Sequence, residues 1–328
     1  MGDSKLGPFR LTPWFSKRPW GRLDLRPWYA DTGTPEPVGE AWLTGPESVV
    51  ETGPMAGRTL AQVAAEAGDA LLGAGRTGEG GGGIGKDRIN RDGGGEFPLL
   101  VKLLFPNDKL SVQVHPDDAQ AQAMGQPRGK TECWYVLEAA PGATIGLGLK
   151  RGATAEAVKA GIADGTLEQL MEWVPVEVGD MVFVDAGTVH AIGPGVVLLE
   201  TQQTSDTTFR MYDYGRGREL HVEQALRTMK TQTAAGKVAA KKMDGFVRLI
   251  AQRYFVVDRY EVGAGGAVTI PIEGAGCLVG LRGTGLVESE GATAVELLRG
   301  QAAVVPADAG SVVVRSDAGA SLVRCWAP

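Results

Sequence analysis

The chain has few of the residues that build disulfide-rich or cysteine-based metal domains. Its three cysteines, Cys133, Cys277 and Cys325, are spread over much of a 328-residue sequence. They are too few and too scattered for a disulfide framework or an all-cysteine zinc site. We therefore interpret them as buried, reduced thiols.

Long hydrophobic runs and dense basic clusters are also missing. No apolar run approaches the roughly 18 to 20 residues that a membrane helix requires, and residues 1–10 lack the apolar segment of a signal peptide. We therefore expect a cytoplasmic protein without membrane contact. The formal net charge is −6, and no cluster of Lys and Arg is typical of nucleic-acid binding. We expect no nucleic-acid partner.

The sequence does contain many short segments that favour β-structure. They run through residues 97–213 and resume after residue 245, separated by Gly, Pro and Asp turns. This pattern predicts a β-barrel or β-sandwich. Helical spacing at 59–75, 154–173 and 221–229 predicts a few short helices.

Two β modules are predicted, because residues 300–314 echo residues 179–193 in their order of turn, apolar strand and turn. The second copy has no histidine. We predict an N-terminal catalytic domain at 1–226, a connector at 227–245 and a degenerate C-terminal β domain at 246–328.

A glycine-rich stretch at 76–96 resembles a phosphate-binding loop only superficially. Gly85 and Lys86 are followed by Asp87 rather than Ser or Thr, and no apolar strand precedes them. We interpret this stretch as a surface loop within the N-terminal domain.

Three segments offer potential metal ligands. Gln113 and His115 are two positions apart in "QVH" and share a strand face, as do Lys130 and Glu132 in "KTE"; His190 follows a Gly turn. Each residue alone also fits an ordinary structural or solvated position. Together, two imidazoles, a carboxylate and an amide oxygen form a mixed shell that suits zinc, with iron, manganese and cobalt also compatible.

Glu132 strengthens this interpretation. It opens the apolar run "CWYVL", which we expect to be buried. A buried carboxylate without a partner costs several kcal/mol, and a bound cation would remove that cost.

At this point the sequence resembles a known family. The segments "FPLLVKLLFPNDKLSVQVHPDD", "GKTECWYVLEA", "GDMVFVDAGTVHAIG" and "LLETQQTSDTTFRMYDYGR" are similar to class I mannose-6-phosphate isomerases, a metal-dependent cupin family, in their short bacterial form. The similarity is strongest over 97–216, and "VGEAWLTG" at 38–45 fits the family's N-terminal strand. It implies an all-β-dominated fold, with a cupin-type β-barrel (jelly roll), a second degenerate β-barrel module and a few short helices.

The resemblance also implies a reaction and a cofactor. The reaction interconverts mannose 6-phosphate and fructose 6-phosphate by proton transfer through an enediol, as part of carbohydrate metabolism. The expected cofactor is one divalent metal ion, preferably zinc, and the expected partner is a small sugar phosphate. We expect a monomer or a small homo-oligomer.

Site residues follow by position. The metal ligands implied by the resemblance are Gln113, His115, Glu132 and His190. Arg210 becomes the active-site arginine, Lys130 faces the substrate, and Ser111 reaches the phosphate if its strand is regular. The general base stays open between Lys130 with a lowered pKa, a metal-bound water and an acidic neighbour.

Other polar residues are interpreted as structural. Asp117 and Asp118 are expected to form the turn after Pro116, Asp206 is expected in a turn, and His221 is expected to begin a helix.

Two departures and two alternatives accompany the resemblance. The chain has Lys-Thr-Glu at 130–132 where larger family members have Lys-Pro-Glu, and it lacks their helical insertion. An iron-dependent cupin oxygenase is one alternative, because two His and a carboxylate also suit ferrous iron. A non-catalytic sugar-phosphate-binding cupin is the other, since fold alone does not decide function.

Overall fold

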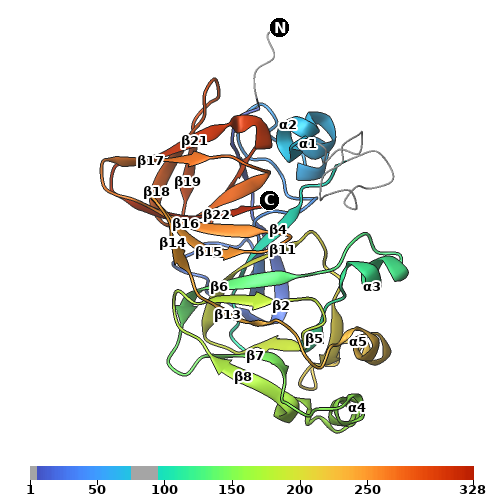
Figure 1. Ribbon diagram of the computed structural model, residues 1–328. Coiled ribbons are helices and arrows are strands. Elements are labelled where there is room, and N and C mark those ends of the chain that lie inside the picture. Colours follow the sequence, from blue (N-terminus) through green and yellow to red (C-terminus); the bar gives the residue numbers. More distant parts are fainter. Residues whose placement is uncertain (1–5, 75–94) are drawn as a thin grey trace.

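The structure, a computed structural model, describes residues 6–74 and 95–328. Strands dominate it and pair antiparallel in three sheets, which form two β modules stacked on one another (Figure 1). The predicted all-β-dominated fold with a second β module and a few short helices is confirmed. Among the described residues, no helix is long and apolar enough to cross a membrane.

The first module consists of two facing sheets. The larger sheet contains, in spatial order, β13 (Gly236–Val238), β9 (Met181–Val184), β6 (Glu132–Ala139), β11 (Val196–Gln203), β4 (Leu99–Leu104), β3 (Val38–Trp42) and β2 (Trp14–Arg22). The smaller contains β12 (Phe209–Tyr212), β5 (Val112–Val114), β10 (His190–Ile192), β7 (Thr144–Leu149) and β8 (Met171–Pro175). Trp134 and Val182 of the larger sheet pack with Ile145 of the smaller in a core between them.

The second module is built from one branched sheet that curls around its own core. Its main path is β1 (Phe9–Leu11), β20 (Ala302–Val305), β18 (Gly276–Glu288), β22 (Ala320–Trp326), β16 (Val256–Val262), β15 (Val247–Ala251) and β14 (Lys241–Lys242). Its branches are β17 (Gly266–Pro271), β21 (Ser311–Ser316) and β19 (Val295–Leu298). Because β1 pairs with β20, the first strand of the chain completes the sheet of the last module.

The predicted connector at 227–245 contributes to both modules. Its β13 pairs with β9 of the first module, whereas β14 pairs with β15 of the second. The division at 226 and 246 stays a prediction, and the chain passes between the modules within this segment.

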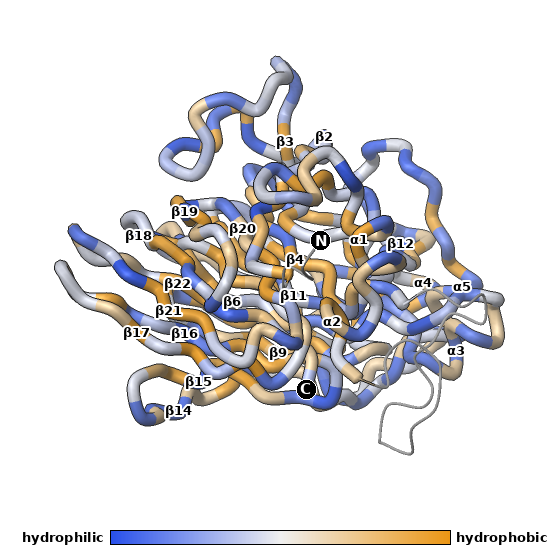
Figure 2. The backbone as a smooth tube through the Cα atoms, turned by 90° about the horizontal axis from the view of Figure 1, so that it is seen from above, coloured by the Kyte–Doolittle hydropathy of each residue, from blue (hydrophilic) through white to orange (hydrophobic). Residues whose placement is uncertain are grey.

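The largest core lies between the two modules. Side chains alternate along β6, so that Trp134 points into the first module while Cys133 packs outward with Val279 and Cys325 of the second. Every residue of β4 is buried, because this strand is covered on both faces. Figure 2 shows the hydrophobic stretches gathered on these central strands and the hydrophilic ones in the outer loops. All three cysteines are buried and free, as predicted.

Truncation of Leu103 is expected to test this central core. Leu103 is fully buried on β4 in the cluster that joins the modules, so Leu103→Ala should lower the free energy of unfolding by about 3 kcal/mol. Urea unfolding measures the change. In the control Leu23→Ala, the side chain is 74% exposed and the change should stay within about 0.5 kcal/mol. Equal effects of the two substitutions would contradict the assignment of the core.

The helices are short and cover the outside of the sheets. They are α1 (Leu60–Ala67), α2 (Asp69–Leu72), α3 (Asp118–Ala123), α4 (Ala155–Asp164) and α5 (Val222–Thr228), with 3-10 turns η1 (Leu167–Leu170) and η2 (Ala307–Ala309). Val112 and Val114 of β5 pack against α4 and α5. The apolar face of this strand therefore points out of the barrel toward helices, and its polar face points in.

Two helix predictions need correction. The single helix expected at 59–75 is two helices, because Gly68 adopts a positive φ of 50° between them. The helical segment expected at 154–173 ends at Leu170, and Met171 begins β8. The glycine-rich stretch lies almost wholly outside the described residues, so its interpretation stays a prediction.

Candidate metal centre and active site

The site forms inside the first module, where the smaller sheet faces the start of β6. Gln113 on β5 is in register with His190 on β10 and with Arg210 on β12. Three adjacent strands therefore present an amide, an imidazole and a guanidinium side by side. Glu132, the first residue of β6, approaches from the other sheet. The polar strand face predicted to carry Gln113 and His115 therefore lies next to His190 and Glu132.

Both imidazoles are oriented by backbone carbonyl groups. Nδ1 of His115 donates to the carbonyl oxygen of Thr207 at 3.0 Å, and Nδ1 of His190 donates to that of Thr188 at 2.9 Å. A carbonyl can only accept, so each Nε2 keeps its lone pair and faces the site. Burial, reinforced by nearby cationic groups, holds the pKa of His115 well below its usual range, and burial lowers the pKa of His190 to about 4. Neutral imidazoles are the form that binds metal.

Glu132 completes a three-residue group. Its Oε1 lies 3.4 Å from Nε2 of His190, and its Oε2 lies 3.6 Å from Nε2 of His115. One ligand atom from each residue falls within 4.8 Å of the others. Oε1 is buried and accepts no hydrogen bond from any described residue. An orphaned buried carboxylate oxygen beside two imidazole nitrogens that carry lone pairs fits a divalent cation.

Gln113 stands next to this group with its amide turned. Its Nε2 lies 3.3 Å from Nε2 of His190, while Ser111 Oγ lies 3.4 Å from Oε1. A half-turn of the amide would present Oε1 toward the same point. The structure therefore places Gln113 beside the three ligands, and its role as a fourth ligand stays a proposal.

The ammonium group of Lys130 contacts the side chains of His115 and Glu132. Its Nζ lies 3.1 Å from Nε2 of His115 and donates a hydrogen bond to Oε2 of Glu132. Burial acts to lower the pKa of Lys130, but the carboxylates of Glu132 and Glu200 outweigh it and raise that pKa above its usual value. Lys130 is therefore an ammonium group here. Its role as a general base was predicted on the condition that an adjacent cation and burial lower this pKa, so that role stays a prediction.

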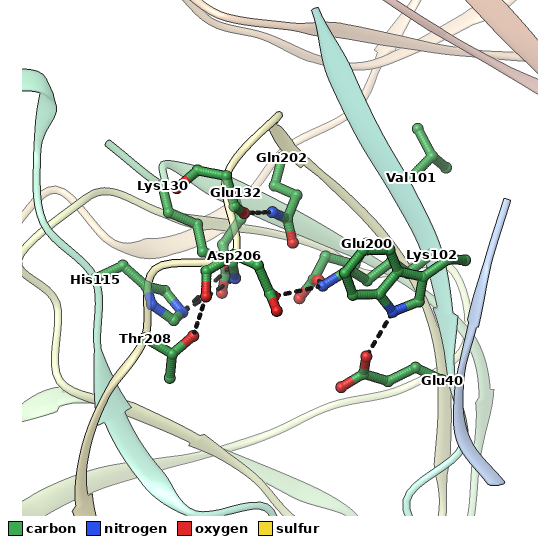
Figure 3. A network of polar contacts seen from close by, with 12 residues as sticks. Glu40, Val101, Lys102, His115, Lys130, Glu132, Glu200, Gln202, Asp206 and Thr208 are labelled. Carbon is green, nitrogen blue, oxygen red and sulfur yellow. Dashed lines mark hydrogen bonds and ion pairs between the residues drawn. The ribbon is translucent and has the colours of Figure 1, made fainter. Parts of the chain in front are cut away.

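A second set of buried charges adjoins the ligands (Figure 3). Lys102 Nζ lies 3.7 Å from Oε1 of Glu200 and 3.3 Å from Oδ1 of Asp206, and Trp134 donates its indole N–H to Glu200. Glu40 accepts a hydrogen bond from Trp42 and pairs with Arg18. Burial raises the pKa of Glu200.

The charges of this region are paired within the network. The buried ammonium groups of Lys102 and Lys130 face the buried carboxylates of Glu40, Glu132 and Glu200. Glu40 is also paired with the guanidinium group of Arg18. Three cationic groups therefore compensate three carboxylates in a low-dielectric interior, where unpaired charge is costly.

These groups open onto a cavity of about 350 Å³. Ser111, Gln113, Lys130 and Arg210, all predicted site residues, line it. Nε of Arg210 is buried and has no hydrogen-bond partner in the described part of the chain, while its Nη1 donates to the carbonyl oxygen of Glu219. One edge of the guanidinium is thus anchored and the other is available to an anion.

Several cavity residues were not found from the sequence, namely Arg18, Glu40, Lys102, Glu200 and Arg218. A signal existed for two of them. Lys102 and Glu200 interrupt the apolar runs "LLVKLL" and "VVLLE" on strands that are otherwise buried, and an interior charge in such a run requires a partner.

Some residues that were expected to be purely structural lie at the site or support it. Asp206, expected in a turn, lies in the connection between β11 and β12 and also lines the cavity beside Lys102. His221 precedes α5, as predicted, and its Nδ1 accepts a hydrogen bond from the backbone N–H of Arg210 at 3.1 Å. It therefore helps to hold the arginine strand. Asp117 and Asp118 were expected to form a turn, and they instead cap and begin the helix α3.

A buried His-Glu-His group inside a β-barrel, beside a cavity lined by Lys and Arg, is typical of a metal-dependent cupin-type enzyme for an anionic substrate. The phosphomannose isomerase type I catalytic-domain family matches residues 9–138. A mannose-6-phosphate isomerase of Streptococcus mutans is 34% identical over 268 residues, covering 78% of this chain and 79% of that protein. The mannose-6-phosphate isomerase ManA of Bacillus subtilis is 36% identical over 237 residues, covering 68% of each.

Solved structures agree along the whole chain. The crystal structure of a Bacillus subtilis mannose 6-phosphate isomerase aligns with a TM-score of 0.80 and 27% identity, covering 98% of this chain and 99% of that one. A zinc-bound mannose 6-phosphate isomerase shares the fold, with a TM-score of 0.76 at 17% identity over 98% of this chain and 100% of that one. This chain belongs to the type I phosphomannose isomerase family.

Proposed function

We propose that this chain interconverts mannose 6-phosphate and fructose 6-phosphate. The observation that carries the proposal is the buried group of His115, Glu132 and His190, which adjoins a cavity with cationic side chains through Gln113 and Lys130, in a chain of this family. The reaction moves a proton between C1 and C2 through an enediol, which places negative charge on sugar oxygens. Cationic walls and a divalent ion both suit that charge.

The metal is proposed to be zinc, held by His115, Glu132 and His190 with Gln113 as a fourth ligand. Nitrogen and oxygen donors of this kind are common zinc ligands. When bound, the ion supplies Lewis-acid stabilisation of charge on the substrate oxygens and holds them in place. The residues contribute two neutral imidazoles of fixed tautomer and one carboxylate.

Arg210, Lys130 and Ser111 are proposed to bind the substrate. Arg210 offers its unpartnered Nε edge to an oxyanion, and Ser111 offers a hydroxyl from the neighbouring strand. Lys130, as an ammonium group, donates hydrogen bonds to sugar oxygens that gain charge. Arg210 and Lys130 are therefore the proposed catalytic residues among those predicted from the sequence.

Glu200 is proposed to carry the proton between C1 and C2. Its carboxylate lines the cavity, and burial raises its pKa, which brings a carboxyl group closer to the range useful for proton transfer near neutral pH. The indole of Trp134 fixes the other carboxylate oxygen at 3.1 Å. Of the three bases left open by the sequence, an acidic neighbour is the one that this geometry favours.

Broader properties are proposed from composition. The net charge of −6 and the anion-sized cavity support a small sugar phosphate as partner, with no role for nucleic acid. We also propose a cytoplasmic enzyme that acts as a monomer or a small homo-oligomer.

Metal removal tests the function directly. Zinc-loaded protein is expected to convert mannose 6-phosphate to fructose 6-phosphate in a coupled assay, chelator-treated protein is expected to lose that activity, and added zinc is expected to restore it. The chelated sample should keep its β-sheet circular dichroism. Turnover that survives complete metal removal, or a folded, zinc-loaded protein without turnover, would contradict the proposal. Activity that requires iron and oxygen instead would support the oxygenase alternative.

A further inference from the structure

A carboxylate at the joint between the two modules receives hydrogen bonds from three separate segments. Asp118, the first residue of α3, accepts from the hydroxyl of Tyr254 at 2.6 Å and from Nε2 of Gln203 at 2.9 Å. It also accepts from the backbone N–H of Gly129 at 2.9 Å. Tyr254 belongs to the second module, in the turn between β15 and β16, whereas the other donors belong to the first.

Gln203 extends this set toward the metal ligands. Its Oε1 accepts a hydrogen bond from the backbone N–H of Thr131 at 2.9 Å, and its own N–H donates to the carbonyl oxygen of Thr131 at 3.2 Å. Thr131 stands between Lys130 and Glu132, the two side chains that meet at the site. Both ends of the segment 129–131 are therefore held, by Asp118 at Gly129 and by Gln203 at Thr131.

The segment 129–131 packs closely against residues 116–117, and position 129 has no room for a side chain. A Cβ on Gly129 would lie 2.5 Å from the carbonyl carbon of Asp117 and 2.6 Å from the carbonyl oxygen of Pro116. The backbone of Lys130 also donates to that Pro116 oxygen at 2.9 Å. The segment thus lies flat against the chain that follows His115. A small displacement of it would move Lys130 and Glu132 relative to His115.

We propose that Tyr254, Asp118 and Gln203 form a positioning relay, through which the second module fixes the backbone on both sides of Thr131, and with it Glu132 for metal binding and Lys130 for catalysis. Gln203 and Thr131 are buried, so bulk water does not compete for their hydrogen bonds. These bonds therefore hold the segment 129–131 in one position. None of the three residues touches the substrate in this scheme. The second module then contributes to the site itself, in addition to covering one sheet. The catalytic readout rests on the proposed function, whereas the metal-binding readout does not.

Tyr254→Phe is the first test, because it removes one hydroxyl and leaves the ring. Groups that hydrogen-bond directly to metal ligands typically change metal affinity or activity by about 10- to 100-fold. Tyr254 acts through Asp118 and Gln203, so we expect zinc affinity, measured by chelator competition, to fall by less, up to about tenfold. The rate constant kcat should fall with it while KM changes less. If the wild-type protein shows no isomerase activity, the loss of zinc affinity still tests the relay.

Tyr29→Phe is the matched control. Tyr29 also donates its hydroxyl across the joint between the modules, to the carbonyl oxygen of Gly300, but within the described residues no chain of hydrogen bonds leads from there to the proposed ligands. It should lower thermal stability and leave zinc affinity and kcat unchanged. If Tyr254→Phe changes only thermal stability, as the control does, the relay is wrong and the contact is merely structural.

A double-mutant cycle tests whether the residues act as a unit. Gln203→Leu alone should weaken zinc binding at least as much as Tyr254→Phe, because it acts directly at Thr131. In the double variant the loss of zinc-binding free energy should be much smaller than the sum of the two single losses, since one break already interrupts the relay. Fully additive losses in zinc affinity would overturn the proposal that Tyr254 acts through Gln203.

Discussion

Glu132→Gln is expected to eliminate isomerase activity and high-affinity zinc binding together. Removing outer partners of a metal typically costs about 10- to 100-fold, and Glu132 would contact the ion itself, so the loss should reach or exceed the upper end of that range. The substitution keeps the shape of the side chain and removes its charge. Zinc affinity by chelator competition and turnover by the coupled assay measure the two effects.

The same substitution should also destabilise the metal-free protein. Lys130 donates to Glu132 in a site where both side chains are almost fully buried, and loss of one partner of a buried ion pair costs about 3 to 5 kcal/mol. Glu138→Gln is the control, because it makes the same change on the same strand at a half-exposed position. Its activity and zinc affinity should match the wild type. Zinc binding by Glu132→Gln at wild-type affinity would show that the ion is held elsewhere.

Most of the candidate metal-binding group could be predicted from the sequence because the signals of its members on β5 and β6 are local. Period-two alternation places Gln113 and His115 on one strand face, and the apolar run after Glu132 indicates its burial. The structure confirms both features, with Gln113 in register with His190 and with a buried, orphaned oxygen on Glu132. What the alternation could not give is which face points inward. In a barrel covered by helices both faces of β5 are shielded, so apolar residues do not mark the interior.

The sequence did not predict the groups whose roles depend on pairing across the barrel. Glu40, Lys102 and Glu200 stand on three different strands, far apart in sequence, and become one charge network only through the register of β3, β4 and β11. In the same way, the sequence around Asp118 predicts only a turn. Its link to Tyr254 spans 136 positions and has no local signal. Register and long-range closure, rather than composition, determine these contacts.

Lys130→Met is expected to change metal binding in the opposite direction from Glu132→Gln. In the metal-free protein the Lys130 ammonium group neutralises Glu132 and lies against His115, so it occupies the donor atoms that an ion would use. Without it, Glu132 and Glu200 lose a compensating charge, and the free energy of unfolding should fall by about 3 to 5 kcal/mol. Zinc supplies positive charge at the same place. Its stabilising effect should therefore be larger in the variant than in the wild type, while turnover falls.

Lys102→Met separates this effect from a general loss of buried charge. Lys102 is as buried as Lys130 and pairs with Glu200 and Asp206, but it makes no contact with the proposed ligands among the interactions of the described chain. Its variant should also be destabilised, yet the increase in thermal stability on adding zinc should equal that of the wild type. Thermal unfolding of both variants, with zinc and with chelator, gives the comparison. If the zinc-dependent increase is the same in the two variants, the Lys130 ammonium group does not compete with the ion, and the lysine acts on the substrate alone. A larger increase only in Lys130→Met would mean that the metal-free site is balanced by its own lysine, which must move aside when the ion binds.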